Sequence, residues 1–200
     1  MGRVVAGITI SVDGYFTGPG DGPGRGLGTG GERLHYWVFG GTWTYDDPPG
    51  DDPTPEDNGW MEANLDRLGA VVAGRSTLES ADRWGGRNPF GVPLFIVTHR
   101  TEEQPPETTG FRFVNGLETA VARAREAAGD RDVHIMGGGD LIRQALSAGI
   151  VDELSIVTAP VVLGKGKRLF EGFEDYLVLE HLGVRQSQFA TFVDYRVVRD

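Results

Sequence analysis

Residues 132–146 read DVHIMGGGDLIRQAL, and this stretch decides the fold. Its first five residues form a short, largely apolar run that is typical of a buried strand, and three glycines follow at once. Asp140 then opens a segment whose apolar residues recur at helical spacing, and Gly149 ends it. The pattern of strand, glycine turn and helix is the repeating unit of a parallel sheet covered by helices.

The rest of the chain repeats this unit and then departs from it. The last three expected strands have no helices between them, which indicates antiparallel pairing. The sequence therefore predicts an α/β fold of three layers, with helices on both faces of a mixed sheet of about eight strands, mainly parallel with an antiparallel C-terminal edge. We expect strands at 4–10, 70–73, 94–98, 111–114, 132–136, 153–159, 177–184 and 188–198, and helices that begin at Asn58, at Ser76 or Thr77, at Asn115 and at Asp140.

Composition excludes several classes of function. The 200 residues include 19 basic and 29 acidic side chains, a net charge of −10, which argues against broad contact with nucleic acid or an anionic membrane. Cysteine is absent, so disulfides and thiolate chemistry are excluded, and the four histidines lack metal-binding spacing, so we expect no metal. With no signal peptide or membrane-spanning run, we expect a cytoplasmic protein.

The N-terminal quarter interrupts the pattern. We treat residues 1–200 as one domain with a Gly/Pro-rich insert at about 17–58. Residues 17–31 contain eight glycines, which predicts an extended or mobile loop. The aromatic stretch 32–39 predicts a helix or an ordered lid, and we expect the segment to close over a bound substrate.

Three strand-to-helix turns carry candidate cofactor-binding residues. Each lies beyond the carboxyl end of an expected strand, where open α/β sheets bind ligands. A structural explanation is also available, since glycine turns and capped helices need no ligand. Together the turns favour a phosphorylated nucleotide, and their cations favour the 2′-phosphate of NADPH over NADH. The residues are Gly74, Arg75, Ser76 and Thr77 in the first turn, Thr98, His99 and Arg100 in the second, and Gly137, Gly138 and Gly139 in the third.

Four other residues could contribute to chemistry or to structure. Asp13 follows the first strand, where burial in a cleft would raise its pKa for acid catalysis; the alternative is an ordinary Asp-Gly turn. Glu32 is a second carboxylate candidate. Trp37 either stacks on a flat heterocycle or covers the sheet. His134 alternates with apolar residues, which predicts a structural histidine with its hydrogen bonds satisfied.

The sequence resembles the dihydrofolate reductase-like superfamily, and most closely the reductase domain of the bacterial riboflavin-biosynthesis deaminase–reductase. The resemblance covers nearly the whole chain and implies an NADPH-dependent reductase on an eight-stranded sheet. We expect no zinc deaminase domain, because the sequence has no cysteine to build its zinc site. The motifs are Ser11-Val-Asp-Gly14, Val71-Val-Ala-Gly-Arg-Ser-Thr-Leu-Glu79, Ile135-Met-Gly-Gly-Gly-Asp-Leu141, Val151-Asp-Glu-Leu154 and Pro160-Val-Val-Leu-Gly-Lys-Gly-Lys-Arg-Leu-Phe170.

The resemblance also implies a role for each candidate. The sites 74–77, 98–100 and 137–141 would hold the cofactor phosphates, with Asp140 and Leu141 part of the last, where Asp140 would also cap the helix. Ala6 would lie beside the nicotinamide and Asp13 near the substrate. Glu32 falls roughly where dihydrofolate reductases carry their acid. The resemblance to this branch also implies a homodimer.

These observations favour an NADPH-dependent reductase that transfers a hydride to a small heterocyclic, carbonyl or imine substrate, with Asp13 delivering the proton. Two alternatives stay open: a dihydrofolate reductase proper, and an NADP(H)-binding module without turnover.

Overall fold

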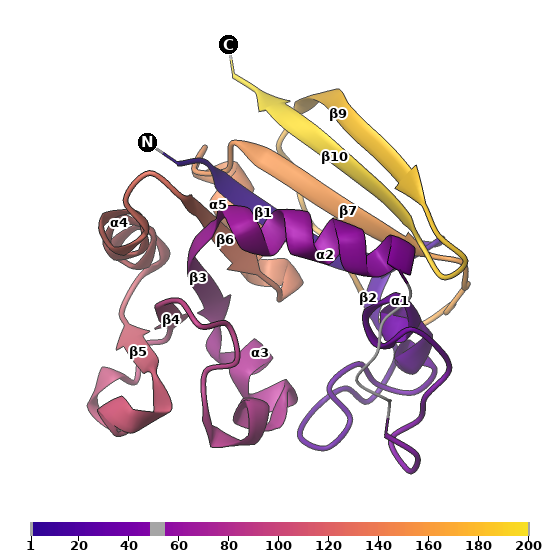
Figure 1. Ribbon diagram of the computed structural model, residues 1–200, viewed down its shortest axis with the longest axis horizontal. Coiled ribbons are helices and arrows are strands. Elements are labelled where there is room, and N and C mark those ends of the chain that lie inside the picture. The colour runs from indigo at the N-terminus through magenta and orange to yellow at the C-terminus, as the bar shows by residue number, and fades with distance from the viewer. Residues whose placement is uncertain (1, 49–54, 200) are drawn as a thin grey trace.

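The computed structural model describes residues 2–48 and 55–199, which form one eight-stranded sheet with helices on both faces (Figure 1). The strand order is β5-β4-β3-β6-β1-β7-β10-β9. The first six strands are parallel, and β10 runs antiparallel to both of its neighbours. The predicted mixed sheet is therefore confirmed. The strands are β1 Val4–Ser11, β3 Leu68–Gly74, β4 Leu94–Val97, β5 Phe111–Val114, β6 Asp132–Met136, β7 Glu153–Ala159, β9 Val178–Gln186 and β10 Thr191–Val198.

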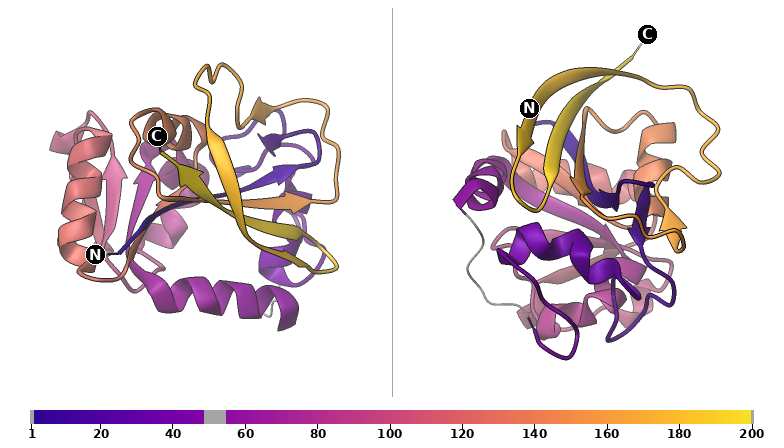
Figure 2. Two further views of the ribbon diagram at one scale, coloured as in Figure 1. Left: turned by 90° about the horizontal axis from the view of Figure 1, so that it is seen from above. Right: turned by 90° about the vertical axis from the view of Figure 1, so that its right-hand side faces the viewer.

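Helices cover the two faces of the sheet. α4 and α5 pack on the face that carries Val4, Ala6 and Ile135, and α1, α2 and α3 lie on the other face. Seen from above, α2 and α5 stand on opposite sides of the sheet (Figure 2). The helices are α1 Tyr36–Phe39, α2 Pro55–Arg67, α3 Arg75–Ser80, α4 Leu117–Ala128 and α5 Gly139–Ser147, with 3-10 turns at Gly31–His35, Asp82–Gly86, Thr101–Glu103 and Glu107–Thr109.

The helix starts differ from those predicted. α2 begins at Pro55, three residues before Asn58, because proline is already set for the first helical turn. Glycines occupy the N-cap positions of α3, α4 and α5, so the polar side chains predicted as caps do not perform that role. In particular, Gly138 caps α5, and Asp140 lies in its first turn.

The glycine-rich segment is folded back on itself and is not extended. The N–H of Gly18 donates to the carbonyl of Leu27 at 2.8 Å, and the N–H of Leu27 donates to the Tyr45 hydroxyl at 2.8 Å. A Cβ on Gly28 would lie 2.3 Å from the Gly18 carbonyl oxygen, so the fold of this segment depends on glycine. The sequence pattern showed glycine content but not these pairings.

A second, two-stranded sheet joins this segment to the C-terminal part of the chain. β2 Tyr15–Thr17 pairs with β8 Lys167–Arg168. Neither strand was predicted, because two or three residues give no measurable periodicity. Lys167 adds an ion pair to Asp21, with 2.6 Å between Nζ and Oδ2.

Candidate functional site

Two of the three predicted turns meet at the carboxyl ends of adjacent strands. β3 ends at Gly74 and leads into α3, and β6 leads through Gly137 and Gly138 into α5. A Cβ on Gly138 would lie 3.6 Å from the Thr77 Oγ1 atom, and a Cβ on Gly137 would lie 3.7 Å from it. The structure therefore places the hydroxyl-bearing turn 74–77 directly against the glycine turn 137–139.

The paired turns fit a phosphate group. Side chains at 137 and 138 would fill the space in front of the Thr77 hydroxyl, and a Cβ on Gly139 would lie 2.4 Å from a ring carbon of Phe16. The glycines leave backbone N–H groups at the start of α5 approachable, where the helix dipole favours an anion. The structural explanation holds at the same time, since Gly137 has a φ of 45°.

Asp140 and Leu141 differ in what they can offer this site. The Asp140 carboxylate accepts a hydrogen bond from Arg143, which also donates to the carbonyl of Leu169 at 2.7 Å. The positive charge of Arg143 thus offsets the negative charge of Asp140 beside the candidate anion site. Leu141 is 6% exposed within the core, so only its backbone is available to a ligand.

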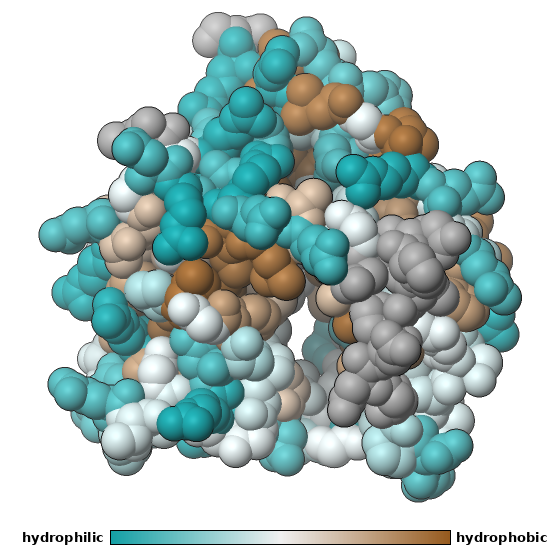
Figure 3. Space-filling view, in the orientation of Figure 1, coloured by the Kyte–Doolittle hydropathy of each residue, from teal (hydrophilic) through white to brown (hydrophobic). Residues whose placement is uncertain are grey.

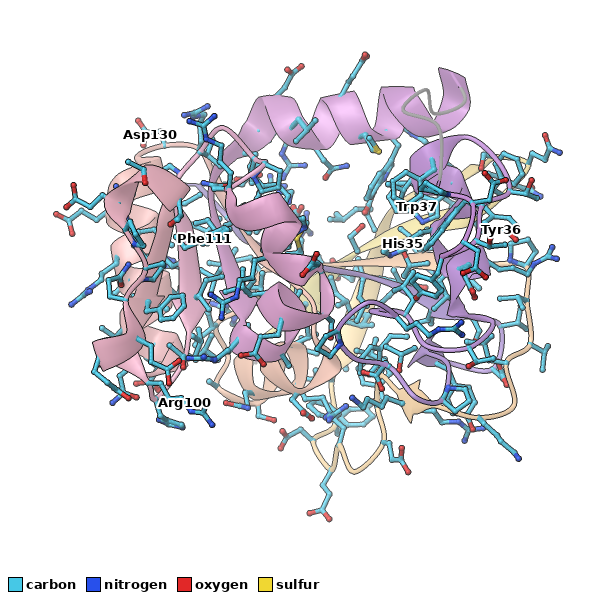
Figure 4. The ribbon with its side chains drawn as sticks, turned by 90° about the horizontal axis from the view of Figure 1, so that it is seen from below. His35, Tyr36, Trp37, Arg100, Phe111 and Asp130 are labelled. Carbon is cyan, nitrogen blue, oxygen red and sulfur yellow. The ribbon has the colours of Figure 1, made fainter. Side chains whose placement is uncertain are left out.

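The third turn, after β4, is held together by its own polar contacts. Thr98 is buried, and its hydroxyl accepts a hydrogen bond from the N–H of Arg100 at 3.1 Å. His99 Nδ1 lies 3.0 Å from Asn115 Oδ1. Arg100 has a side chain that is 65% exposed and lies at the edge of the molecule (Figure 4). Thr98 is thus closed to a ligand, whereas the exposed side chains of His99 and Arg100 are open to one.

Arg75 is committed to carboxylates. Its Nε donates to Glu79 at 2.7 Å, and its Nη2 donates to Glu103. The guanidinium also lies over the ring of Phe113, 5.6 Å from its centroid. The predicted phosphate-binding cation is therefore already paired.

Ala6 and Gly7 face opposite sides of β1. Ala6 is fully buried toward α4 and α5, so its side chain points away from the face that carries α2. Gly7 lies on that face, between Met136 of β6 and Ser155 of β7. A Cβ on Gly7 would be 4.0 Å from Ser155, which leaves the centre of the sheet accessible. A flat ring would therefore meet Gly7, with Ala6 available only through its backbone.

α2 lies over the face of the sheet that carries Gly7 and is fixed to the sheet near both of its ends. At the end of the helix, Arg67 Nε donates to Asp132 at 2.8 Å and its Nη2 donates to Glu153 at 3.2 Å. Toward its start, Trp60 packs on Phe192 with 5.0 Å between ring centroids. Figure 3 shows an opening in the centre of this face, below α2, and Figure 4 shows it from beneath.

Trp37 forms part of the wall of this opening. It is 7% exposed, and its Nε1 donates to the Thr9 hydroxyl at 3.1 Å. Its ring makes edge contacts with Trp60 and Phe192, both at 5.3 Å between centroids. The predicted alternative of cover over the sheet therefore describes Trp37 better than stacking on a substrate.

Glu32 lies in the turn Gly31–His35, one turn away from Trp37. Burial, and then the charge of Glu32, raise the pKa of Tyr45. Glu32 is thus close to the folded glycine-rich segment. Burial also lowers the pKa of His35 to about 4, although part of this residue is accessible.

Asp13 is held as a carboxylate, contrary to the expectation that its pKa is raised. The Ser11 hydroxyl donates to it at 2.6 Å, and the N–H groups of Gly164 and Leu163 donate at 2.7 and 3.0 Å. These donors lower the pKa of Asp13 to about 2. The residue ties the end of β1 to the segment that precedes β8.

Three polar residues beneath α2 were not assigned to the site from the sequence. The Ser155 hydroxyl donates to Asp194 of β10 at 2.5 Å on the same face as Gly7. His134 also lies on this face, and its buried Nε2 has no hydrogen-bond partner within residues 2–48 and 55–199, contrary to the prediction of a histidine with its hydrogen bonds satisfied. Burial lowers the pKa of His134 to about 4. Ser155 had a sequence signal, a small polar residue inside an apolar strand.

The described part of the chain holds neither a candidate metal site nor a candidate membrane-spanning helix. Residues 2–48 and 55–199 contain no group of three or more His, Asp or Glu side chains placed to hold a metal ion. No helix in these ranges has the length and apolar character needed to cross a bilayer.

The sheet order and the helices on both faces define a dihydrofolate reductase-like fold. A structure described as dihydrofolate reductase from Enterococcus faecalis complexed with NADP(H) has a TM-score of 0.62 at 15% identity, covering 98% of this chain and 96% of that one. Another, described as a putative riboflavin biosynthesis protein from Shewanella sp. PV-4, has a TM-score of 0.72 at 23% identity, covering 98% and 99% of the two chains.

Within this class the family is defined by the sequence. The model of the RibD C-terminal domain matches residues 3–189, and the chain belongs to this family. The uncharacterized protein YwjB of Bacillus subtilis is 26% identical over 140 residues, which cover 70% of this chain and 79% of YwjB. The resemblance stated from the motifs is confirmed.

Proposed function

We propose that the protein is an NADPH-dependent reductase that transfers a hydride to a small heterocyclic, carbonyl or imine substrate. The observation that carries this proposal is the pair of facing turns, Gly74–Thr77 and Gly137–Gly139, beside a sheet face left open at Gly7. Membership of the RibD C-terminal domain family supports a reductase, and the NADP(H)-bound dihydrofolate reductase with the same fold supports the cofactor.

Different residues of the chain would bind different parts of the cofactor. Backbone N–H groups at 137–139 and the Thr77 hydroxyl would hold the pyrophosphate, and Arg100 would meet the 2′-phosphate. The nicotinamide would lie on Gly7, and NADPH supplies the hydride when bound. Trp37 and Trp60 exclude water from one end of the space beneath α2.

The substrate would lie between α2 and the floor formed by Ser155 and Asp194. The Ser155 hydroxyl uses its hydrogen on Asp194, which leaves the carboxylate able to accept from a substrate N–H. A nitrogen heterocycle carries such groups. Asp13, with a pKa of about 2, carries no proton near neutral pH, so its part is to position the loop at 163–164.

Thermal unfolding with NADPH, with NADH and without ligand tests the cofactor. A ligand at about 100 times its Kd adds roughly 2.7 kcal/mol, which is several degrees for a chain of this size. Turnover is tested by NADPH oxidation with a panel of imines, pterins and carbonyls. A shift with NADPH but no oxidation would favour the module without turnover, and no shift with either cofactor would overturn the reductase.

We also propose a homodimer formed through the outer strand of the sheet. β9 is an edge strand, and Val178, Leu182 and Val184 on it are 44%, 41% and 61% exposed. The mass in solution, measured by light scattering, should be that of two chains, and Val184→Glu should shift it toward one. A wild-type protein that stays monomeric at high concentration would refute this pairing.

A further inference from the structure

The cluster around Arg75 bridges two strand ends of the candidate cofactor site. Arg75 begins α3 after β3, and Glu103 ends the 3-10 turn that follows β4. The Arg75 side chain is 16% exposed and pairs with Glu79 on its own helix and with Glu103 across the gap. Glu103 therefore joins the turn 74–77 to the turn 98–100.

Glu103 also lies close to the second arginine. Its Oε1 is 3.8 Å from Arg100 Nη1, and its N–H donates to the Arg100 carbonyl at 3.2 Å, which fixes the turn. The hydrogen bond from Arg75, and then the charge of Arg100, lower the pKa of Glu103, so it is ionised at neutral pH. The Glu103 carboxylate thus lies between Arg75 and Arg100, where the sequence predicts that a phosphate binds.

This arrangement reduces the electrostatic advantage of a 2′-phosphate. Arg75 and Arg100 are matched one to one by Glu79 and Glu103, and Arg83 is a third cation whose charge acts on Glu103. These contacts are much shorter than the Debye length of about 8 Å, so salt does not screen the repulsion between Glu103 and a bound 2′-phosphate. Carboxylate and phosphate also need the same guanidinium N–H groups.

We infer that Glu103 is a specificity-determining residue: it pairs with Arg75 and lies 3.8 Å from Arg100, so it competes with the cofactor's 2′-phosphate for both arginines and narrows the preference for NADPH over NADH. The inference rests on the proposed function, because it assumes that a nicotinamide cofactor binds at these turns with its 2′-phosphate at Arg100. A 2′-phosphate placed there meets the Glu103 carboxylate, whereas NADH carries no such phosphate.

Glu103→Gln tests the inference, because it keeps the size of the side chain and removes its charge. Calorimetry should show about tenfold tighter binding of NADPH and of 2′,5′-ADP, with little change for NADH and 5′-AMP. The two nucleotide fragments report on the site without any turnover. Glu102→Gln is the matched control: it removes the same charge from the same turn and should leave the ratio of the NADPH and NADH affinities unchanged.

The outcomes separate this inference from the proposed function. Wild-type binding of both cofactors, with an affinity ratio that Glu103→Gln does not change, would overturn the inference and leave the reductase standing. An equal gain for the two variants would show a general charge effect and would also overturn it. Failure of the wild-type protein to bind any of the four ligands would overturn both.

Discussion

The two sides of the opening beneath α2 are built in different ways. On one side, β3, β4 and β6 each end in a short turn that leads into a helix or a 3-10 turn. On the other side, the segment 17–48 holds few regular elements and is fixed by glycine contacts, Tyr45 and an aromatic cluster. The strands and helices of the first side follow local signals in the sequence, whereas the fold of the second side depends on contacts such as the hydrogen bond between Leu27 and Tyr45, 18 residues apart.

The largest effect should follow a change inside the regular side. Gly69 lies in β3, where a Cβ would be 2.6 Å from the Cβ of Ala128 and 2.7 Å from that of Arg131. Because both atoms belong to the packed end of α4 and the chain just after it, Gly69→Ala should lower the free energy of unfolding by about 3 kcal/mol. Urea unfolding measures it, with Gly183→Ala, which meets nothing within 4 Å, as the control. Equal free energies of unfolding for the two variants would contradict the prediction and would show that α4 moves away from the added methyl group at little cost.

The difference between local signals and long-range contacts also explains which parts of the structure could be predicted from the sequence. The bounds of β5, β6 and β7 match the expected strands residue for residue, because apolar runs and glycine breaks are local signals. The pairing of Arg75 with Glu103 joins residues 28 apart, and the donors to Asp13 lie at 163 and 164. The residue types alone predicted three cations, Arg75, His99 and Arg100, and a catalytic acid at Asp13, whereas the long-range contacts pair Arg75 and keep Asp13 ionised.

A pH experiment compares one histidine from each side. The pKa values of His134 and His35 are about 4 when folded, below the ordinary 6.5, so the folded protein keeps both neutral. The unfolded chain gains protons first as the pH falls, so stability decreases between pH 6.5 and 4. His134→Gln should remove about 2 kcal/mol of the loss measured by urea unfolding between pH 7 and pH 5.

His35→Gln provides the comparison for that experiment. An equal reduction would show that the irregular segment buries its histidine as firmly as the sheet does. An unchanged pH dependence in His134→Gln would mean that the folded protein protonates the ring of His134.

A smaller effect is expected where the two sides meet. Trp37→Phe removes the hydrogen bond from Nε1 to Thr9, at 3.1 Å in a buried site, and keeps an aromatic ring near Trp60 and Phe192. The free energy of unfolding should fall by about 1 kcal/mol. A double-mutant cycle with Thr9→Val isolates the bond, and a coupling energy near zero would show that Thr9 does not anchor α1 to the sheet.

The smallest effect on global stability is expected in the glycine-rich segment. A Cβ on Gly26 would lie 2.3 Å from the carbonyl oxygen of Ser80, the last residue of α3, so Gly26→Ala must lift the segment from the helix. The free energy of unfolding should change by less than about 0.5 kcal/mol, because few core side chains lie in 18–31. Hydrogen exchange at the amides of 26–29 should become faster.

Gly22→Ala is the matched control, because a Cβ there meets nothing within 4 Å and the paired hydrogen bonds between Gly22 and Arg25 use only backbone atoms. Faster exchange in Gly26→Ala alone would show that the segment rests on α3 before any ligand binds, so that it must open to admit a cofactor. Unchanged exchange in both variants would mean that the contact with Ser80 does not hold the segment, and closure would then depend on the ligand.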